Sequence, residues 1–167
     1  SAASDVYKRQ ITVIPSKGFM IRQLNDKDMK DSIEIRCAIE GFCTNMVASQ
    51  IDTEKGRQLL HSLEQTLSDM EESLENGVQL EHFIDSDHQF HLLLVGYMEN
   101  DEFNQIFQRL LYLIRLTSQD ALAVEGRIQG TMEEHRNYLH ALRNGDGPRA
   151  YQLMMEHLLM PLKMHEK

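Results

Sequence analysis

From residue 25 onward, hydrophobic residues recur every three or four positions almost without a break, which is the spacing of one face of an α-helix. Glycines, prolines and capping residues divide this pattern into segments. The sequence therefore predicts an all-α fold, an antiparallel bundle of about six helices with mostly short connections. The predicted helices cover about 26–49, 52–76, 80–99 and 102–122, then a segment between Thr131 and Gly145, and a last one that starts at Asp146.

Several residues are suited to the ends of these helices. Asn25 is a typical N-cap for the first helix, which has acids in its first turn. Thr131 and Glu134 have the spacing of a capping box, which predicts the start of the fifth helix. Gly145 would end that helix, and Pro148 fits the first turn of the sixth, where its missing N–H costs little.

Residues 11–24 have a different pattern, with two short β-prone runs on either side of the turn cluster Pro15–Gly18. They predict a small β-hairpin. An isolated hairpin is only marginally stable in water, so we expect it to belong to a larger unit. Residues 1–10 show no periodicity and stay unassigned, with a cloning scar as one interpretation.

Composition narrows the class of protein. The 167 residues suffice for one domain with a core, and 41% hydrophobic and 26% charged residues are ordinary for a globular protein. No apolar run approaches the roughly 20 residues of a membrane helix, and the start does not resemble a signal peptide. Because Cys37 and Cys43 lie in one predicted helix, we expect no disulfide framework and a cytoplasmic location.

Charge is unevenly distributed along the chain. The net charge is -9, yet residues 1–30 carry six Lys or Arg against three acids. A basic end joined to an acidic body suits a DNA-facing edge attached to a sensing domain.

Three of the eight histidines are predicted to face the core, because their neighbours at three and four positions are mostly apolar. These are His91, His135 and His157, each on a different helix, and Asp87 shares the face of His91 at i, i+4. A buried carboxylate and three buried imidazoles need partners, and one divalent cation would satisfy all four. The alternative is a hydrogen-bonded core network without metal. His61, His82 and His140 have polar neighbours, and His88 has a mixed environment.

Several motifs resemble the FCD effector domain of the FadR-like branch of GntR transcriptional regulators, over roughly residues 11–165. The motifs are Asp87-His-Gln-Phe90-His91, Glu134-His135, Gly145-Asp146 with Ala150, Met154-Met-Glu-His157-Leu158, and Arg36-Cys-Ala-Ile39-Glu40, where Ile replaces the usual Leu. The segment Val13–Phe19 resembles the wing of the winged helix-turn-helix that precedes this domain.

The resemblance implies a domain plan and a function. Residues 25–167 would form the ligand-binding and dimerisation domain, and residues 11–24 would be the wing remnant. Metal-binding members use the Asp and three His as ligands, bind small organic acids in the same cavity, and bind operator DNA as homodimers. The recognition helix is missing from these residues, so we do not expect them to bind an operator alone.

The chemistry of these side chains suggests which metal ions could bind and which arginines could hold a ligand. Three imidazoles and a carboxylate leave coordination positions free for a hydroxy or keto acid, and suit Zn, Ni, Fe or Mn. Arg36 lies on an inward stripe and is a candidate to bind a carboxylate, with a surface salt bridge to Glu40 as the alternative. Arg115 is a second ligand-binding candidate, with exposure to solvent as its alternative.

Two other functions compete with a sensor. A metal-dependent enzyme would need a general acid or base near bound water. Glu134 is adjacent to His135 in sequence, but consecutive helical residues point about 100° apart, so we expect it to face away. A structural or interaction bundle is the other alternative, since the ten methionines suit either a core or an interface. A cavity beside the metal would favour the sensor.

Overall fold

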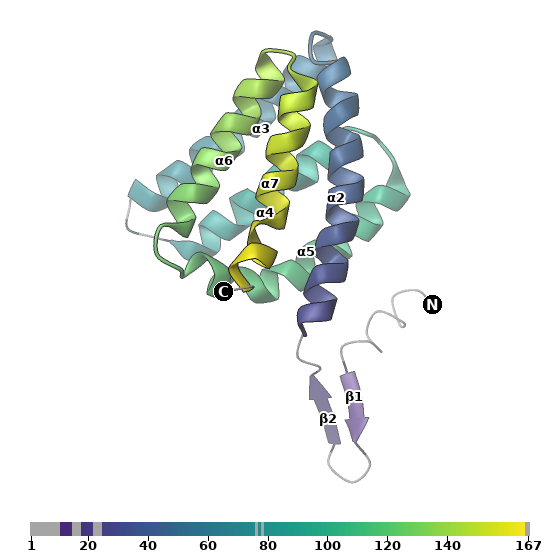
Figure 1. Cartoon of the computed structure of the whole chain (residues 1–167), viewed down its shortest axis with the longest axis vertical. Helices are drawn as coiled ribbons and strands as arrows, with labels where there is room; N and C mark the ends of the chain where they lie inside the picture. The colour runs from purple at the N-terminus through teal and green to yellow at the C-terminus, as the bar shows by residue number, and fades with distance from the viewer. Residues whose placement is uncertain (1–10, 15–17, 22–24, 76, 78, 166–167) are drawn as a thin grey trace.

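The computed structural model describes residues 11–14, 18–21, 25–75, 77 and 79–165 (Figure 1). Within this part of the chain, six helices pack into a bundle, as the periodicity predicts. The elements are β1 (Ile11–Ile14), β2 (Gly18–Ile21), α2 (Asp26–Ser49), α3 (Glu54–Glu75), α4 (Leu80–Gly96), α5 (Asp101–Leu122), α6 (Arg127–Arg143) and α7 (Gly147–His165).

The two strands β1 and β2 pair antiparallel, with Ile11 opposite Ile21 and Ile14 opposite Gly18. The predicted turn at 15–17 and the unassigned residues 1–10 lie outside the described residues. Strand pairing alone does not identify the domain to which these strands belong.

Helix α2 packs beside α7 and also contacts α4 and α5 (Figure 1). Helix α3 packs on α4 and α6, and α6 packs on α7. The core between them contains fully buried aromatic rings, including Phe90 and Phe107. Met70, Met132 and Met154 are also buried there, so these three methionines serve core packing. Among the described residues, none of the helices has the length and apolar character that a membrane crossing requires.

Most helix ends agree with the sequence prediction. Asn25 caps α2, since its side chain accepts from the backbone N–H of Asp28 and Asp28 accepts in return. Gly145 has φ 67°, the left-handed conformation that ends α6 and that glycine adopts without strain. Asp146 accepts from the N–H of Arg149 at the start of α7.

Two predicted ends are wrong. Helix α4 ends at Gly96, before the predicted 99, and Asn100 then caps α5 by accepting from the N–H groups of Glu102 and Phe103. Helix α6 begins at Arg127, so Thr131 lies inside it and forms no capping box. The Thr131 hydroxyl donates to the carbonyl of Arg127 instead, 3.0 Å away, which is a common use of threonine within a helix.

Candidate metal centre

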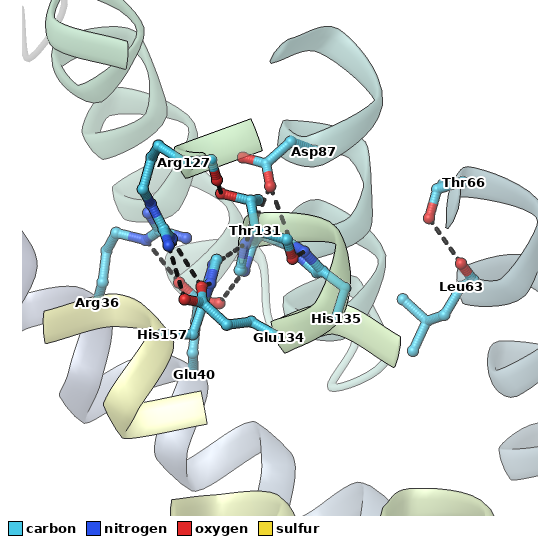
Figure 2. Close-up of polar contacts among 11 residues, drawn as sticks. Arg36, Glu40, Leu63, Thr66, Asp87, Arg127, Thr131, Glu134, His135 and His157 are labelled. Atoms are coloured by element: carbon cyan, nitrogen blue, oxygen red, sulfur yellow. Dashed lines mark hydrogen bonds and ion pairs between the residues drawn. The ribbon is translucent and has the colours of Figure 1, made fainter. Parts of the chain in front are cut away.

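One imidazole from each of three helices and one carboxylate meet inside the bundle. Asp87 and His91 come from α4, His135 from α6 and His157 from α7. Figure 2 shows Asp87, His135 and His157 directed toward one another. One nitrogen or oxygen atom of each side chain lies within 4.8 Å of the others. The inward orientation expected for the three histidines is thus observed, and the i, i+4 spacing places Asp87 and His91 on one face of α4.

His135 presents an unprotonated nitrogen to this centre. Its Nδ1 donates to the backbone carbonyl of Thr131, 2.8 Å away, and this acceptor assigns the proton to Nδ1. The ring of Phe90 packs edge-on against the imidazole with centroids 4.4 Å apart, which fixes its orientation. His135 Nε2 therefore carries a lone pair, and Asp87 Oδ1 lies 3.3 Å from it. Both atoms are buried and have no hydrogen-bond partner among the described residues.

His91 is oriented by a buried carboxylate from α2. Its Nδ1 contacts Glu40 Oε2, and the other oxygen of Glu40 accepts from Arg36 Nε at 2.6 Å. The Glu40 side chain is completely buried, so Arg36 and His91 supply the partners that its burial requires. With Nδ1 occupied by Glu40, His91 Nε2 is left as the acceptor toward the centre.

His157 has a matching partner from α6. Its Nδ1 lies 2.7 Å from Glu134 Oε2, and Arg127 binds both oxygens of Glu134 at 2.7 Å each (Figure 2). His157 Nε2 lies 3.2 Å from His91 Nε2. Two lone pairs at this distance repel each other, and either a proton on one of the nitrogens or a cation beside them relieves the repulsion.

The chemistry of the donor set fits a divalent metal ion. Three imidazole Nε2 atoms and Asp87 Oδ1 converge as acceptors, while each Nδ1 donates outward to Glu40, to Glu134 or to a carbonyl. Outer hydrogen bonds of this kind fix the tautomer of metal-binding histidines and increase their basicity. Glu40, Glu134 and the Thr131 carbonyl thus form an outer shell of hydrogen-bond partners that suits metal binding.

Burial and neighbouring charge set the protonation of the centre. Burial lowers the pKa of His135 to about 4, with a smaller lowering from His157, and burial lowers the pKa of His91 well below its usual value. Burial alone would raise the pKa of Asp87, but the surrounding imidazoles outweigh it and hold this pKa below its usual value. Neutral imidazoles and an ionised carboxylate are the forms that bind a metal ion.

The metal-free protein should lose stability in acid because of His135. Its folded pKa of about 4 lies below its ordinary 6.5, so the unfolded chain binds this proton first as the pH falls. His135 therefore costs nothing above pH 6.5, and between pH 6.5 and 4 it destabilises the fold by up to about 3 kcal/mol. Urea unfolding of wild type and His135→Gln with chelator present should show the larger acid loss in wild type.

The comparison of two proteins isolates His135. Burial raises the pKa of Glu40, which acts in the opposite direction above pH 4.5, and because His135 is only a minor cause of this shift, most of the contribution is common to both proteins. Parallel stability curves for the two proteins over this pH range would contradict the prediction.

A cavity of about 370 Å³ lies directly beside the centre. Asp87 and His157 form part of its wall, together with Arg36, Arg127 and Thr131. The volume falls within the range of small-molecule sites, roughly 300–1,000 Å³. Ligand atoms in this cavity would contact both the metal ligands and two guanidinium groups.

The structure brings one of the two candidate arginines to the site. Arg36 lines the cavity, as a ligand-binding residue would, and its role there stays a prediction. It also pairs with Glu40, but this ion pair is buried, so the expected surface salt bridge is wrong. Its Nη2 is buried and has no hydrogen-bond partner among the described residues. Arg115 is not part of the cavity wall and pairs on the outside with Glu81 and Asp85.

Sequence reasoning missed the outer shell of the centre. Glu134 does not face away as expected, because α7 brings His157 against its side chain. Glu40 was considered only as an i, i+4 partner of Arg36, and the sequence holds no local signal for its contact with His91. The closest signal is that each glutamate lies near an arginine on its own helix. His88 is also buried but lies outside the cluster.

Comparisons with known proteins identify the family of this chain. The model of the FCD domain family matches residues 31–159. The uncharacterized HTH-type transcriptional regulator YdhC of Bacillus subtilis (strain 168) is 25% identical over 140 residues, which cover 84% of this chain and 61% of YdhC. The chain thus spans less than two thirds of that relative.

Solved structures share the fold. E. coli McbR/YncC superimposes with a TM-score of 0.77 at 14% identity, over 98% of this chain and 76% of that chain. The Zn2+-bound FCD domain of TM0439 has a TM-score of 0.61 at 21% identity, over 82% of this chain and 90% of that one.

Proposed function

Because this chain belongs to the FCD domain family, we propose that it is the effector-sensing domain of a bacterial GntR-type transcriptional regulator. A divalent metal ion would be held by Asp87, His91, His135 and His157, and a small organic acid would bind beside it. The observation that carries the proposal is the cavity against the cluster, since a purely structural metal site is closed by protein ligands.

Two findings support a metal at the four residues. The orphaned atoms Asp87 Oδ1 and His135 Nε2 need a cation, and the FCD domain of TM0439 is known in a Zn2+-bound form. The donor set suits Zn, Ni, Fe and Mn alike. A bound ion would supply positive charge and open coordination positions for the oxygens of a hydroxy or keto acid.

Arg36 is the proposed anchor for the ligand carboxylate. Glu40 binds its Nε, and the ring of Phe107 lies 5.7 Å from the guanidinium carbon, so the group is held in place. Its buried, unpartnered Nη2 leaves a donor for a carboxylate at the cavity wall. Arg127 differs, because Glu134 already occupies both of its terminal nitrogens.

The ligand would act on α2. The cavity wall includes Arg36 and also Asn25, the N-cap of this helix. Asn25 directly follows the segment 11–24, which we propose as the wing of a winged helix-turn-helix domain. A ligand that binds one placement of α2 better than another shifts the population toward it. In the complete homodimeric regulator, this shift would change the relation of the DNA-binding heads to operator DNA.

The surroundings of the site favour a sensor over an enzyme. YdhC is described as a transcriptional regulator, and the glutamates beside the centre are engaged. Arg127 holds the pKa of Glu134 at about 2 against the raising effect of burial, and His157 adds to this. Glu40 lies between Arg36 and His91. Neither carboxylate is free to exchange a proton with bound water.

Titration of the zinc-loaded protein with lactate tests the proposal. We expect Arg36→Lys to weaken lactate binding by about 10- to 100-fold, because a charge-assisted hydrogen bond contributes roughly 1.5–3 kcal/mol. Zinc content should stay unchanged at saturating zinc, since Arg36 contacts the proposed ligand His91 only through Glu40 and lysine keeps the positive charge beside Glu40. Arg115→Ala is the matched control and should bind lactate as wild type does, as measured by isothermal titration calorimetry.

Each outcome has a separate meaning. Equal lactate affinity in Arg36→Lys and wild type would refute the anchor. Absence of binding by lactate and other small acids to zinc-loaded wild type would contradict the sensor itself.

A further inference from the structure

The wall of the cavity is polar at one end and apolar over the rest. The polar end contains Arg36, Asp87 and His157 at the metal centre. Beyond them the wall is formed mainly by side chains without hydrogen-bonding groups, which α2, α5 and α7 contribute. Examples are Met29, Ile33, Ala121, Leu158, Pro161 and Met164.

The apolar part extends in one direction, away from the metal centre. Met29, Ile33 and Arg36 lie on one stripe of α2, and the rise of an α-helix places Met29 about 10 Å from Arg36 along the axis. Pro161 and Met164 follow His157 toward the C-terminal end of α7. That end lies beside the N-terminal end of α2 at the same end of the bundle (Figure 1). The cavity therefore runs from the metal toward the start of α2.

Polar groups along this path are already engaged or carry the wrong charge for a second carboxylate. The hydroxyl of Ser118 donates to the carbonyl of Ile114 in its own helix, 2.9 Å away. Asp26, exposed at the far end of the wall, would repel a second ligand carboxylate. Hydroxyl groups on a ligand tail would lose water there without gaining partners, which is unfavourable.

We propose that the natural ligand is a 2-hydroxy or 2-keto monocarboxylic acid with an aliphatic tail, rather than a sugar acid or a dicarboxylate. The inference rests on the proposed function, because the metal and Arg36 fix the head of the molecule. The tail lies between α2, α5 and α7 and reaches toward Met29 and Met164. At about 30 Å³ for each water-sized group, the 370 Å³ cavity holds on the order of twelve non-hydrogen atoms.

A homologous series of acids tests the tail. Calorimetry on the zinc-loaded full chain would compare lactate, 2-hydroxyhexanoate and 2-hydroxyoctanoate with gluconate and malate. Each buried methylene should increase affinity about fourfold, so 2-hydroxyhexanoate should bind roughly 50-fold more tightly than lactate. The gain should end near 2-hydroxyoctanoate, which has about eleven non-hydrogen atoms.

One variant locates the tail. Ala121→Leu fills the apolar part of the cavity on α5 and should weaken binding of 2-hydroxyoctanoate at least tenfold more than binding of lactate. Wild type that binds lactate as tightly as the longer acids, or prefers gluconate or malate, would overturn the inference and leave the sensor intact. An unchanged affinity of Ala121→Leu for 2-hydroxyoctanoate would overturn the placement of the tail. If no acid binds zinc-loaded protein, the proposed function fails as well.

Discussion

Zinc is expected to raise the free energy of unfolding of this protein by about 4 kcal/mol when free Zn2+ is about 1,000-fold above its dissociation constant. Micromolar Zn2+ reaches this excess when the dissociation constant is about 1 nM, which corresponds to roughly 12 kcal/mol of binding free energy. For a chain of 167 residues, the change corresponds to about 8–16 °C in Tm. Thermal unfolding with zinc and with chelator measures it.

Two variants identify the origin of this effect. In His135→Ala, His157→Ala the zinc-dependent rise should disappear, and elemental mass spectrometry should find about one bound transition metal per chain in wild type alone. His61→Ala is the control, because His61 is exposed on α3 and outside the cluster. An equal rise in the double variant would show that zinc acts elsewhere, and no rise in wild type would contradict the metal site.

Glu40→Ala is the substitution with the largest expected cost outside the four proposed ligands. It leaves the buried Arg36 guanidinium without its counter-charge and His91 Nδ1 without its acceptor. Removing one partner of a buried ion pair typically costs 3–5 kcal/mol, so we expect a loss of this size in urea unfolding with chelator. Loss of an outer partner of a metal-binding histidine also weakens metal affinity about 10- to 100-fold.

Glu40→Gln separates charge from shape. Glutamine keeps the volume of glutamate and one acceptor oxygen. The Glu40→Gln protein should therefore be more stable than Glu40→Ala, but should bind zinc more weakly than wild type. Glu156→Gln provides a matched surface control, since Glu156 is exposed on α7 and accepts a hydrogen bond from its helical neighbour Gln152. If Glu40→Ala and Glu156→Gln had similar stability and zinc affinity, the contacts of Glu40 with Arg36 and His91 would contribute nothing to either.

The helices and the convergence of the centre were predictable because they depend on local spacing. Hydrophobic periodicity and the Asn25 cap place α2 correctly, and apolar neighbours at three and four positions identify His91 and His135 as inward. Gly126 shows the limit of such rules. It has φ 77° and starts α6 without a side-chain cap, so the nearby capping-box sequence at Thr131 was misleading.

The outer shell was not predictable because its contacts join residues that are distant in sequence. Glu40 meets His91 only after α2 packs on α4, and Glu134 meets His157 only after α7 packs on α6. A helical wheel gives the direction of a side chain from its own axis, but not which neighbouring helix arrives on that side. The same limit applies to the cavity, whose walls come from five helices.

The order of the proposed ligands along the chain would affect how the protein acquires a metal ion. Asp87 and His91 precede His135, and His157 lies in α7, which follows the other helices of the bundle. During synthesis the last imidazole leaves the ribosome only when almost the whole bundle exists, so a nascent or truncated chain ending before α7 lacks a complete site. A bound ion would join α4, α6 and α7, so it would stabilise only the folded arrangement of these three helices. Metal capture would thus mark the completion of folding.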